Sequence, residues 1–271
     1  MTETQPDWNR IAQKFDLWLP HLAPVTDHLL DGLQADNPRR ILDMACGTGE
    51  PALTLAMRYP DASITLVDAA AGMVNVARKK AETAGLENLR FGVMPAESLQ
   101  FPDAAFDRVV CRFGVMLFTD PVAGLGEMWR VLTPGGRFAL SVWGGPDEVP
   151  ALTITVNALN LHLPEDTRSQ IVNQVTSLGP EGVLDGTLQS AGFGDFEISR
   201  HILPYTFPDF DAYWDLVQAS EILKAQFDAL TPDQHDQVRD EVARIAGAYQ
   251  SDGHLVLPQV YLVASGHKPS V

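Results

Sequence analysis

Residues 41–59, ILDMACGTGEPALTLAMRY, predict a strand, a tight turn and a helix in immediate succession. The apolar run 41–45 is typical of a buried strand. Two glycines in the turn 46–49 permit a sharp bend and the close approach of a ligand to the backbone. Pro51 is favoured in a first helical turn, so we expect the helix to begin at residues 50–51. With Ala52, the stretch has the G-x-G-x-x-A spacing of a nucleotide-type site and predicts an adenosine-bearing ligand.

Length and composition agree with a globular α/β protein. A chain of 271 residues fits one large domain, or a core with a smaller cap. With 45% hydrophobic residues it can bury a sizeable core, yet no run of eighteen apolar residues predicts a membrane span. The N-terminus lacks the basic and apolar regions of a secretory signal. Two cysteines, Cys46 and Cys111, provide no disulfide framework, so we expect a reduced, cytoplasmic location.

The net charge of −16 bears on partners. An acidic surface repels nucleic-acid backbones and anionic membranes, which favours a small molecule as the partner. Most of the excess acid is explained by solubility.

Beyond residue 59, strand-like and helix-like segments alternate. Strands are expected at 62–68, 89–94, 106–112 and 137–143, and helices at 72–84 and 121–132. Such alternation predicts a doubly wound, parallel sheet with right-handed crossovers.

The segments around this core suggest a helical cap. We expect an N-terminal helical lid at 1–35, whose aromatic residues at helical spacing suit either core packing or a lid. The cofactor-binding core would cover 36–146. A cap insertion is expected at 147–179 and a continuation of the core at 180–207. A second helical cap insertion would follow at 208–254, and the last core strand with its tail at 255–271.

The acids that flank the glycine turn indicate which ligand it holds. Asp43 precedes the turn and Glu50 follows it, so both carboxylates would face a pyrophosphate bound there. This repulsion in a partly buried site would cost several kcal/mol if the charges were unpaired. The same acids suit S-adenosylmethionine, which carries a sulfonium and an ammonium but no phosphate. Asp68 ends the second expected strand, where its carboxylate can accept both ribose hydroxyls of either ligand.

Four segments in this order resemble class I S-adenosylmethionine-dependent methyltransferases. They are DMACGTGEPAL (43–53), VDAAAGMVNVAR (67–78), PAESLQFPDAAFDRVVCRFGVMLF (95–118) and MWRVLTPGGRFALSVWG (128–144). The branch they resemble includes the ubiquinone/menaquinone methyltransferases and many natural-product methyltransferases. The resemblance implies a seven-stranded, mostly parallel, Rossmann-like sheet, with the strands at 196–203 and 257–265 as its closing hairpin.

The resemblance also implies the roles of individual residues. Asp43, Ala45, Gly47 and Gly49 would cradle the methionine and ribose parts of the cofactor. The remaining cofactor contacts would come from the ribose-binding acid and its neighbour, the adenine-side residues and the end of the fourth strand: Asp68, Ala69, Met73, Ala96, Glu97, Arg112 and Phe113. Many members carry Asp where Pro95 stands, which leaves the adenine contact to Glu97 or the backbone.

The implied reaction transfers a methyl group from S-adenosylmethionine to an O, N or C atom of a small aromatic or apolar metabolite and yields S-adenosylhomocysteine. His21 is the preferred candidate for a general base. An acceptor pocket is expected from apolar and aromatic side chains, namely Phe15, Trp18, Met116, Trp143 and Tyr205. No metal-ligand set is expected. The alternatives are an NAD(P)-dependent oxidoreductase, and a non-methylating enzyme or binding module that uses the same cofactor.

Overall fold

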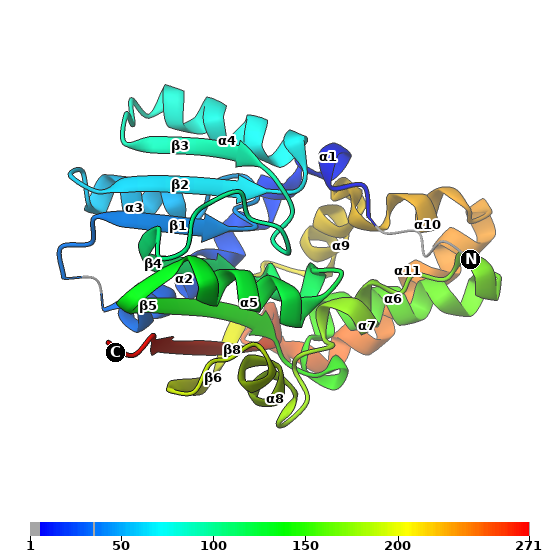
Figure 1. Ribbon diagram of the computed structural model, residues 1–271. Coiled ribbons are helices and arrows are strands. Elements are labelled where there is room, and N and C mark those ends of the chain that lie inside the picture. Colours follow the sequence, from blue (N-terminus) through cyan, green and yellow to red (C-terminus); the bar gives the residue numbers. More distant parts are fainter. Residues whose placement is uncertain (1–5, 35, 271) are drawn as a thin grey trace.

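The computed structural model describes residues 6–34 and 36–270 (Figure 1). One sheet organises the molecule in the order β3-β2-β1-β4-β5-β8-β6, with β7 paired to β8. Neighbours from β3 to β5 are parallel, whereas β8 is antiparallel to both β5 and β6. The strands are β1 (Arg40–Met44), β2 (Ser63–Asp68), β3 (Leu89–Val93), β4 (Phe106–Arg112), β5 (Leu132–Trp143), β6 (Phe196–Phe207), β7 (Gln250–Ser251) and β8 (His254–His267).

The doubly wound, mostly parallel sheet predicted from the sequence is confirmed, but its strand count was wrong. Eight strands replace the expected seven, because the two-residue β7 pairs with the start of β8. A strand this short carries no alternation of apolar and polar residues that a sequence pattern could reveal. The hairpin strands β6 and β8 are also longer than expected, and β8 lies between β5 and β6.

Helices cover both faces of the sheet (Figure 1). The long helix α2 lies across β4, β5, β8 and β6, while α5 packs on β5 and against α8. These layers bury a continuous apolar core that extends from α2 through the sheet into the cap helices. The helices around the sheet are α2 (Leu19–Leu33), α3 (Ala52–Arg58), α4 (Ala71–Thr83), α5 (Pro121–Val131) and α8 (Val183–Ser190).

The cap helices gather beyond the carboxyl ends of the parallel strands, at the right of Figure 1. Helix α11 packs against α6, so the two insertions form one structure. The helices of the second cap insertion, expected at 208–254, are interrupted at Ser220 and again at Thr231, which caps α11. The cap helices are α6 (Pro150–His162), α7 (Ile171–Val175), α9 (Phe210–Ala219), α10 (Lys224–Asp228) and α11 (Pro232–Ala246).

The N-terminal segment approaches the same end of the sheet. It forms the short helix α1 (Trp8–Ile11) and a 3-10 turn (Phe15–Leu17) before α2 begins. Helix α3 begins at Ala52 rather than at residues 50–51, because Pro51 has non-helical backbone dihedrals and is its N-cap. Among the described helices, none combines the length and apolar character needed to cross a bilayer.

Candidate active site

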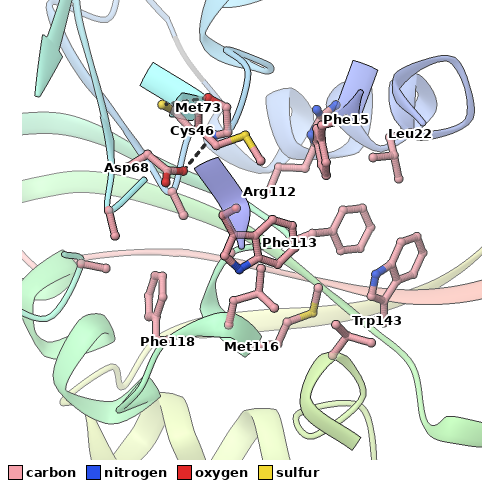
Figure 2. Close-up of a pocket in the computed structure, with 18 of the residues that line it drawn as sticks. Phe15, Leu22, Cys46, Asp68, Met73, Arg112, Phe113, Met116, Phe118 and Trp143 are labelled. Atoms are coloured by element: carbon pink, nitrogen blue, oxygen red, sulfur yellow. Dashed lines mark hydrogen bonds between the residues drawn. The ribbon is translucent and has the colours of Figure 1, made fainter. Parts of the chain in front are cut away.

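A cavity of about 350 Å³ opens at the carboxyl ends of the parallel strands, where the glycine turn follows β1. Ligands of doubly wound folds bind at this edge of the sheet. In Figure 2, Asp68, Cys46 and Met73 lie on one side of the cavity, Trp143 and Met116 lie on the other, and Phe113 stands between them. The cavity therefore joins the glycine loop to an aromatic region.

The glycine loop is shaped by positive backbone dihedrals. Gly47 has φ +53° and lines the cavity, with the ring of Phe15 above it. Gly49 has φ +111° and does not line the cavity. A Cβ at Gly49 would lie 2.9 Å from a methyl carbon of Leu53 and 3.2 Å from the Cβ of Ala77, so glycine lets α3 and α4 approach the loop.

Asp68 ties this loop to the end of β2. Its carboxylate accepts hydrogen bonds from the backbone N–H of Gly47 at 2.9 Å and of Ala70 at 2.8 Å. Burial raises the pKa of Asp68, and these two amides oppose the shift. Each carboxylate oxygen can accept more than one hydrogen bond, so Asp68, which lines the cavity, retains acceptor capacity toward a ligand.

Asp43 lies beneath the loop and does not line the cavity. Its side chain is completely buried, and Oδ2 accepts the backbone N–H of Ala52, the first residue of α3, at 3.1 Å. Its Oδ1 has no partner in the described part of the chain. Burial raises the pKa of Asp43 to about 8, although the nearby guanidinium of Arg112 opposes the shift.

Opposite charges face each other at this end of the cavity. Arg112, at the end of β4, donates to the hydroxyl of Thr26 at 3.3 Å and lines the cavity together with Glu50. Burial lowers the pKa of Arg112, whereas the carboxylates of Glu50 and Asp43 raise it. Glu50 accepts from the hydroxyl of Thr54 at 2.8 Å through one oxygen. The pair offers one cation and one anion to a ligand.

The residues expected beside adenine also line the cavity: Ala69, Met73, Ala96 and Glu97. Glu97 already has protein partners, since its Oε1 accepts the backbone N–H of Thr119 at 2.7 Å. That contact fastens the loop after β3 to the segment before α5. Pro95 lines the cavity without a side-chain donor or acceptor.

Aromatic side chains form the other side of the cavity. Phe113 stacks on Trp143 with ring centroids 4.0 Å apart, and Trp143 meets Tyr205 edge-on at 6.4 Å. Trp18 lies 6.2 Å from Tyr205. All the residues expected in an acceptor pocket line this one cavity: Phe15, Trp18, Met116, Trp143 and Tyr205. Ala45 of the loop and Phe113, the residue after β4, line it as well.

His21 lies behind this aromatic wall and is not among the lining residues. Its ring packs 4.8 Å from Tyr205 and 4.9 Å from Phe207, measured between centroids. Burial lowers its pKa, which favours a neutral ring at neutral pH. In this arrangement, His21 contacts the ring of a lining residue rather than the cavity. Residues 6–34 and 36–270 contain no cluster of three or more His, Cys, Asp or Glu that could hold a metal ion.

Comparisons with known proteins point to one family. Residues 41–136 match a family model described as a methyltransferase domain. A demethylmenaquinone methyltransferase of Deinococcus radiodurans is 48% identical over 106 residues, which cover 39% of this chain. The chain matches only 44% of that relative's length. Residues 41–136 are therefore similar to a methyltransferase domain.

Solved structures share the fold over nearly the whole chain. The YcgJ protein of Bacillus subtilis has a TM-score of 0.62 at 24% identity and covers 91% of this chain and 99% of its own. The [4+2]-cyclase SpnF has a TM-score of 0.58 at 20% identity, with 98% of each chain covered. At these identities the likeness establishes the fold of the chain and nothing about its chemistry.

Several residues that line the cavity were not predicted from the sequence. The largest group comes from the cap, whose sequence pattern gives no sign of which helix face meets the sheet: Val149, Ala151, Leu152, Ile171, Val175 and Ile222. Gln259 was also missed. As an isolated amide in the otherwise apolar stretch LVLPQVYLVA of the last strand, it did carry a signal.

Proposed function

We propose that this chain transfers a methyl group from S-adenosylmethionine to an O, N or C atom of a small aromatic or apolar molecule. The observation that carries the proposal is the single cavity in which a glycine loop and Asp68 adjoin an aromatic chamber. An adenosine-bearing ligand and an apolar acceptor can meet there without crossing solvent.

The residues of the loop fit a cofactor without phosphates. The Ala52 N–H at the start of α3 is already bonded to Asp43, and Glu50 accepts from the hydroxyl and N–H of Thr54. The donors that a pyrophosphate would need at this helix terminus are therefore engaged by the side chains of Asp43 and Glu50. This supports S-adenosylmethionine over a nicotinamide dinucleotide.

Several residues would hold that cofactor. Asp68 would accept the ribose hydroxyls, and the Gly47 backbone would lie against the ribose and methionine parts. Arg112 would bind the amino-acid carboxylate and Glu50 the ammonium, since both line the cavity. When bound, S-adenosylmethionine supplies a methyl group on a positively charged sulfur. Met73 would pack on the adenine face.

The chain's own contribution to the chemistry is positioning and the exclusion of water. The stacked rings of Phe113 and Trp143 give a flat apolar wall against which an acceptor can be aligned. Alignment of two bound reactants by itself supplies much of a rate enhancement. His21 lies outside the cavity, so in this arrangement its ring does not face the acceptor.

Calorimetric titration tests the proposal. We expect binding of S-adenosylmethionine and S-adenosylhomocysteine, and none of NAD or NADP. Binding of the dinucleotides alone would overturn it. A turnover assay that measures S-adenosylhomocysteine release with a panel of phenols, amines and activated carbon acids then tests methyl transfer. Binding of S-adenosylmethionine without release of S-adenosylhomocysteine in the presence of any acceptor would favour the non-methylating alternative.

A further inference from the structure

Two buried polar side chains interrupt the apolar wall on the side of the cavity away from the glycine loop. Tyr205 of β6 is 4% exposed and Gln259 of β8 is 2% exposed, and both line the cavity. The sheet order β1-β4-β5-β8-β6 places these strands beyond β5, on the far side from the loop after β1. The residues therefore lie on the acceptor side.

Neither side chain uses its full hydrogen-bonding capacity within the described part of the chain. Gln259 donates from Nε2 to the carbonyl oxygen of Leu257 at 3.1 Å. Because a carbonyl oxygen only accepts, this contact fixes the amide orientation and leaves Oε1 as a free acceptor. The hydroxyl of Tyr205 has no protein partner there, and burial raises its pKa against the opposing effect of Arg112, so it stays protonated and can donate.

The strand register places these two groups side by side. Tyr205 pairs with Leu257 and Leu203 pairs with Gln259 across the β6–β8 ladder. Tyr205 and Gln259 are thus diagonal neighbours on one face of the sheet, with side chains within common reach of a small ligand. The rings of Trp18, His21 and Trp143 pack around Tyr205 and hold its hydroxyl in place.

One donor next to one acceptor selects a particular ligand group. A hydroxyl can accept from Tyr205 and donate to Gln259 at the same time, whereas a carbonyl or an ether oxygen can only accept. Buried polar groups left unpaired are costly, so binding a group that satisfies both is favoured over binding one that satisfies neither. The surrounding lining is aromatic and aliphatic.

We propose that Tyr205 and Gln259 form a subsite that binds a hydroxyl of the methyl acceptor, which is an aromatic or apolar molecule carrying at least one hydroxyl. This inference rests on the proposed methyltransferase function and adds to it the specificity of the acceptor side. Tyr205 and Gln259 orient the acceptor, and the hydroxyl they bind fixes which edge of the molecule faces the cofactor.

Binding of matched probes tests the subsite. 4-Phenylphenol, 4-methoxybiphenyl and biphenyl are titrated into the protein saturated with S-adenosylhomocysteine. We expect the phenol to bind roughly 5- to 30-fold more tightly than the other two, as one or two hydrogen bonds would give. Tyr205→Phe and Gln259→Met should each remove most of this preference while the affinity for S-adenosylhomocysteine stays unchanged.

Tyr213→Phe is the matched control. Tyr213 is also a buried tyrosine, but its hydroxyl contacts Thr155 and the carbonyl oxygen of Ala151, and it does not line the cavity. Loss of the Tyr213 hydroxyl should leave the preference for 4-phenylphenol over the other two probes unchanged. Equal binding of the three probes by the unmodified protein, or a preference that survives both subsite variants, would overturn the inference. Failure to bind S-adenosylhomocysteine would instead contradict the proposed function.

Discussion

At the scale of single residues, Asp68 connects the shape of the glycine loop to the cavity. We predict that Asp68→Ala lowers the affinity for S-adenosylmethionine by about 5- to 150-fold, the effect of losing charge-assisted hydrogen bonds worth ~1–3 kcal/mol. Calorimetric titration measures this change. Asp68→Asn is the control, since its oxygen can still accept one of the two backbone amides, from Gly47 or Ala70, without the charge. Unchanged affinity in a folded Asp68→Ala protein would exclude the ribose role.

Asp43 gives a prediction about pH and stability. The folded protein holds its pKa at about 8, against an ordinary value of 3.8, chiefly through burial. Between pH 3.8 and about 8, the Asp43 carboxyl group is protonated in the native state and ionised in the unfolded state. The contribution of this group to the free energy of unfolding therefore falls as pH rises from about 4 to about 8 and is constant above.

Urea unfolding of the ligand-free protein at several pH values between about 5 and 8 measures this slope. Asp43→Asn should flatten it, because the amide oxygen can still accept from Ala52 and no proton is exchanged. Identical slopes for the variant and the unmodified protein would show that Asp43 is ionised in the folded state at neutral pH.

His21 packs on Tyr205 instead of facing the cavity, so we predict a modest role. His21→Phe should lower kcat by less than about 10-fold, whereas removal of a general base costs ~10²- to 10⁴-fold. The measurement is kcat as a function of pH with the best acceptor of the turnover panel. A loss of a hundredfold or more, together with the disappearance of an ionisation from the profile, would make His21 the base.

These residues also mark how far the sequence predicts the site. Gly47 and Asp68 could be placed because the motif fixes their positions around one strand–turn–helix junction. The partner of Asp43 could not, since only the folded backbone brings the Ala52 N–H to its carboxylate. Gln259 is separated from the glycine loop by more than two hundred residues of sequence, and only the pairing of β8 with β5 and β6 brings it to the same cavity.

At the scale of elements, polar contacts close the N-terminal segment over the glycine loop. The Asp16 carboxylate accepts a hydrogen bond from the hydroxyl of Thr48 at 2.5 Å and forms an ion pair with the ammonium of Lys80 at 3.1 Å. Lys14 pairs with Glu221 of the cap at 2.9 Å. With Phe15 above Gly47, these contacts make residues 8–17 a lid fastened to the loop, to α4 and to the cap.

We predict that Asp16→Ala opens this lid, because the Thr48 and Lys80 contacts are lost together. Amide hydrogen exchange of residues 8–17 should accelerate several-fold, and the dissociation rate of S-adenosylhomocysteine should rise with it. Asp27→Ala is the control, since Asp27 is an exposed acid of α2 without a hydrogen bond among the described side chains. Exchange as slow as in the control would mean that apolar packing alone holds the lid.

Elements with a clear period were predictable, and those defined by their neighbours were not. The strands β1 to β4 follow apolar runs that local sequence reveals. The break between α9 and α10 depends on Ser220, whose amide bonds back to Leu216 as the chain turns onto the core. Helix α9 buries Tyr213, Trp214 and Val217, whereas α10 has no buried residue, so the two helices lie in different environments on either side of the break.

At the scale of the whole molecule, the cavity belongs to neither the sheet nor the cap alone. Residues from the turn after β1, from β2, β4, β5, β6, β8, α6 and α7, and from the lid meet around it. The sequence predicted the core, the caps and the N-terminal segment separately, but not how they pack together around the cavity. The apolar face of a cap helix has the same sequence pattern whether it packs on a sheet, on a ligand or on another helix. We infer that the caps and the sheet form one cooperative unit.

This inference predicts a single unfolding transition. One buried apolar cluster includes Leu29 of α2, Leu42 of β1, Leu159 of α6 and Val242 of α11, so unfolding the cap alone would expose part of the core. Differential scanning calorimetry should give one peak whose calorimetric and van't Hoff enthalpies agree. S-adenosylhomocysteine at 100 times its Kd should move the whole peak upward, equivalent to about 2.7 kcal/mol. Two peaks, of which only one responds to the ligand, would show that cap and sheet fold independently and that the cavity forms only when they dock.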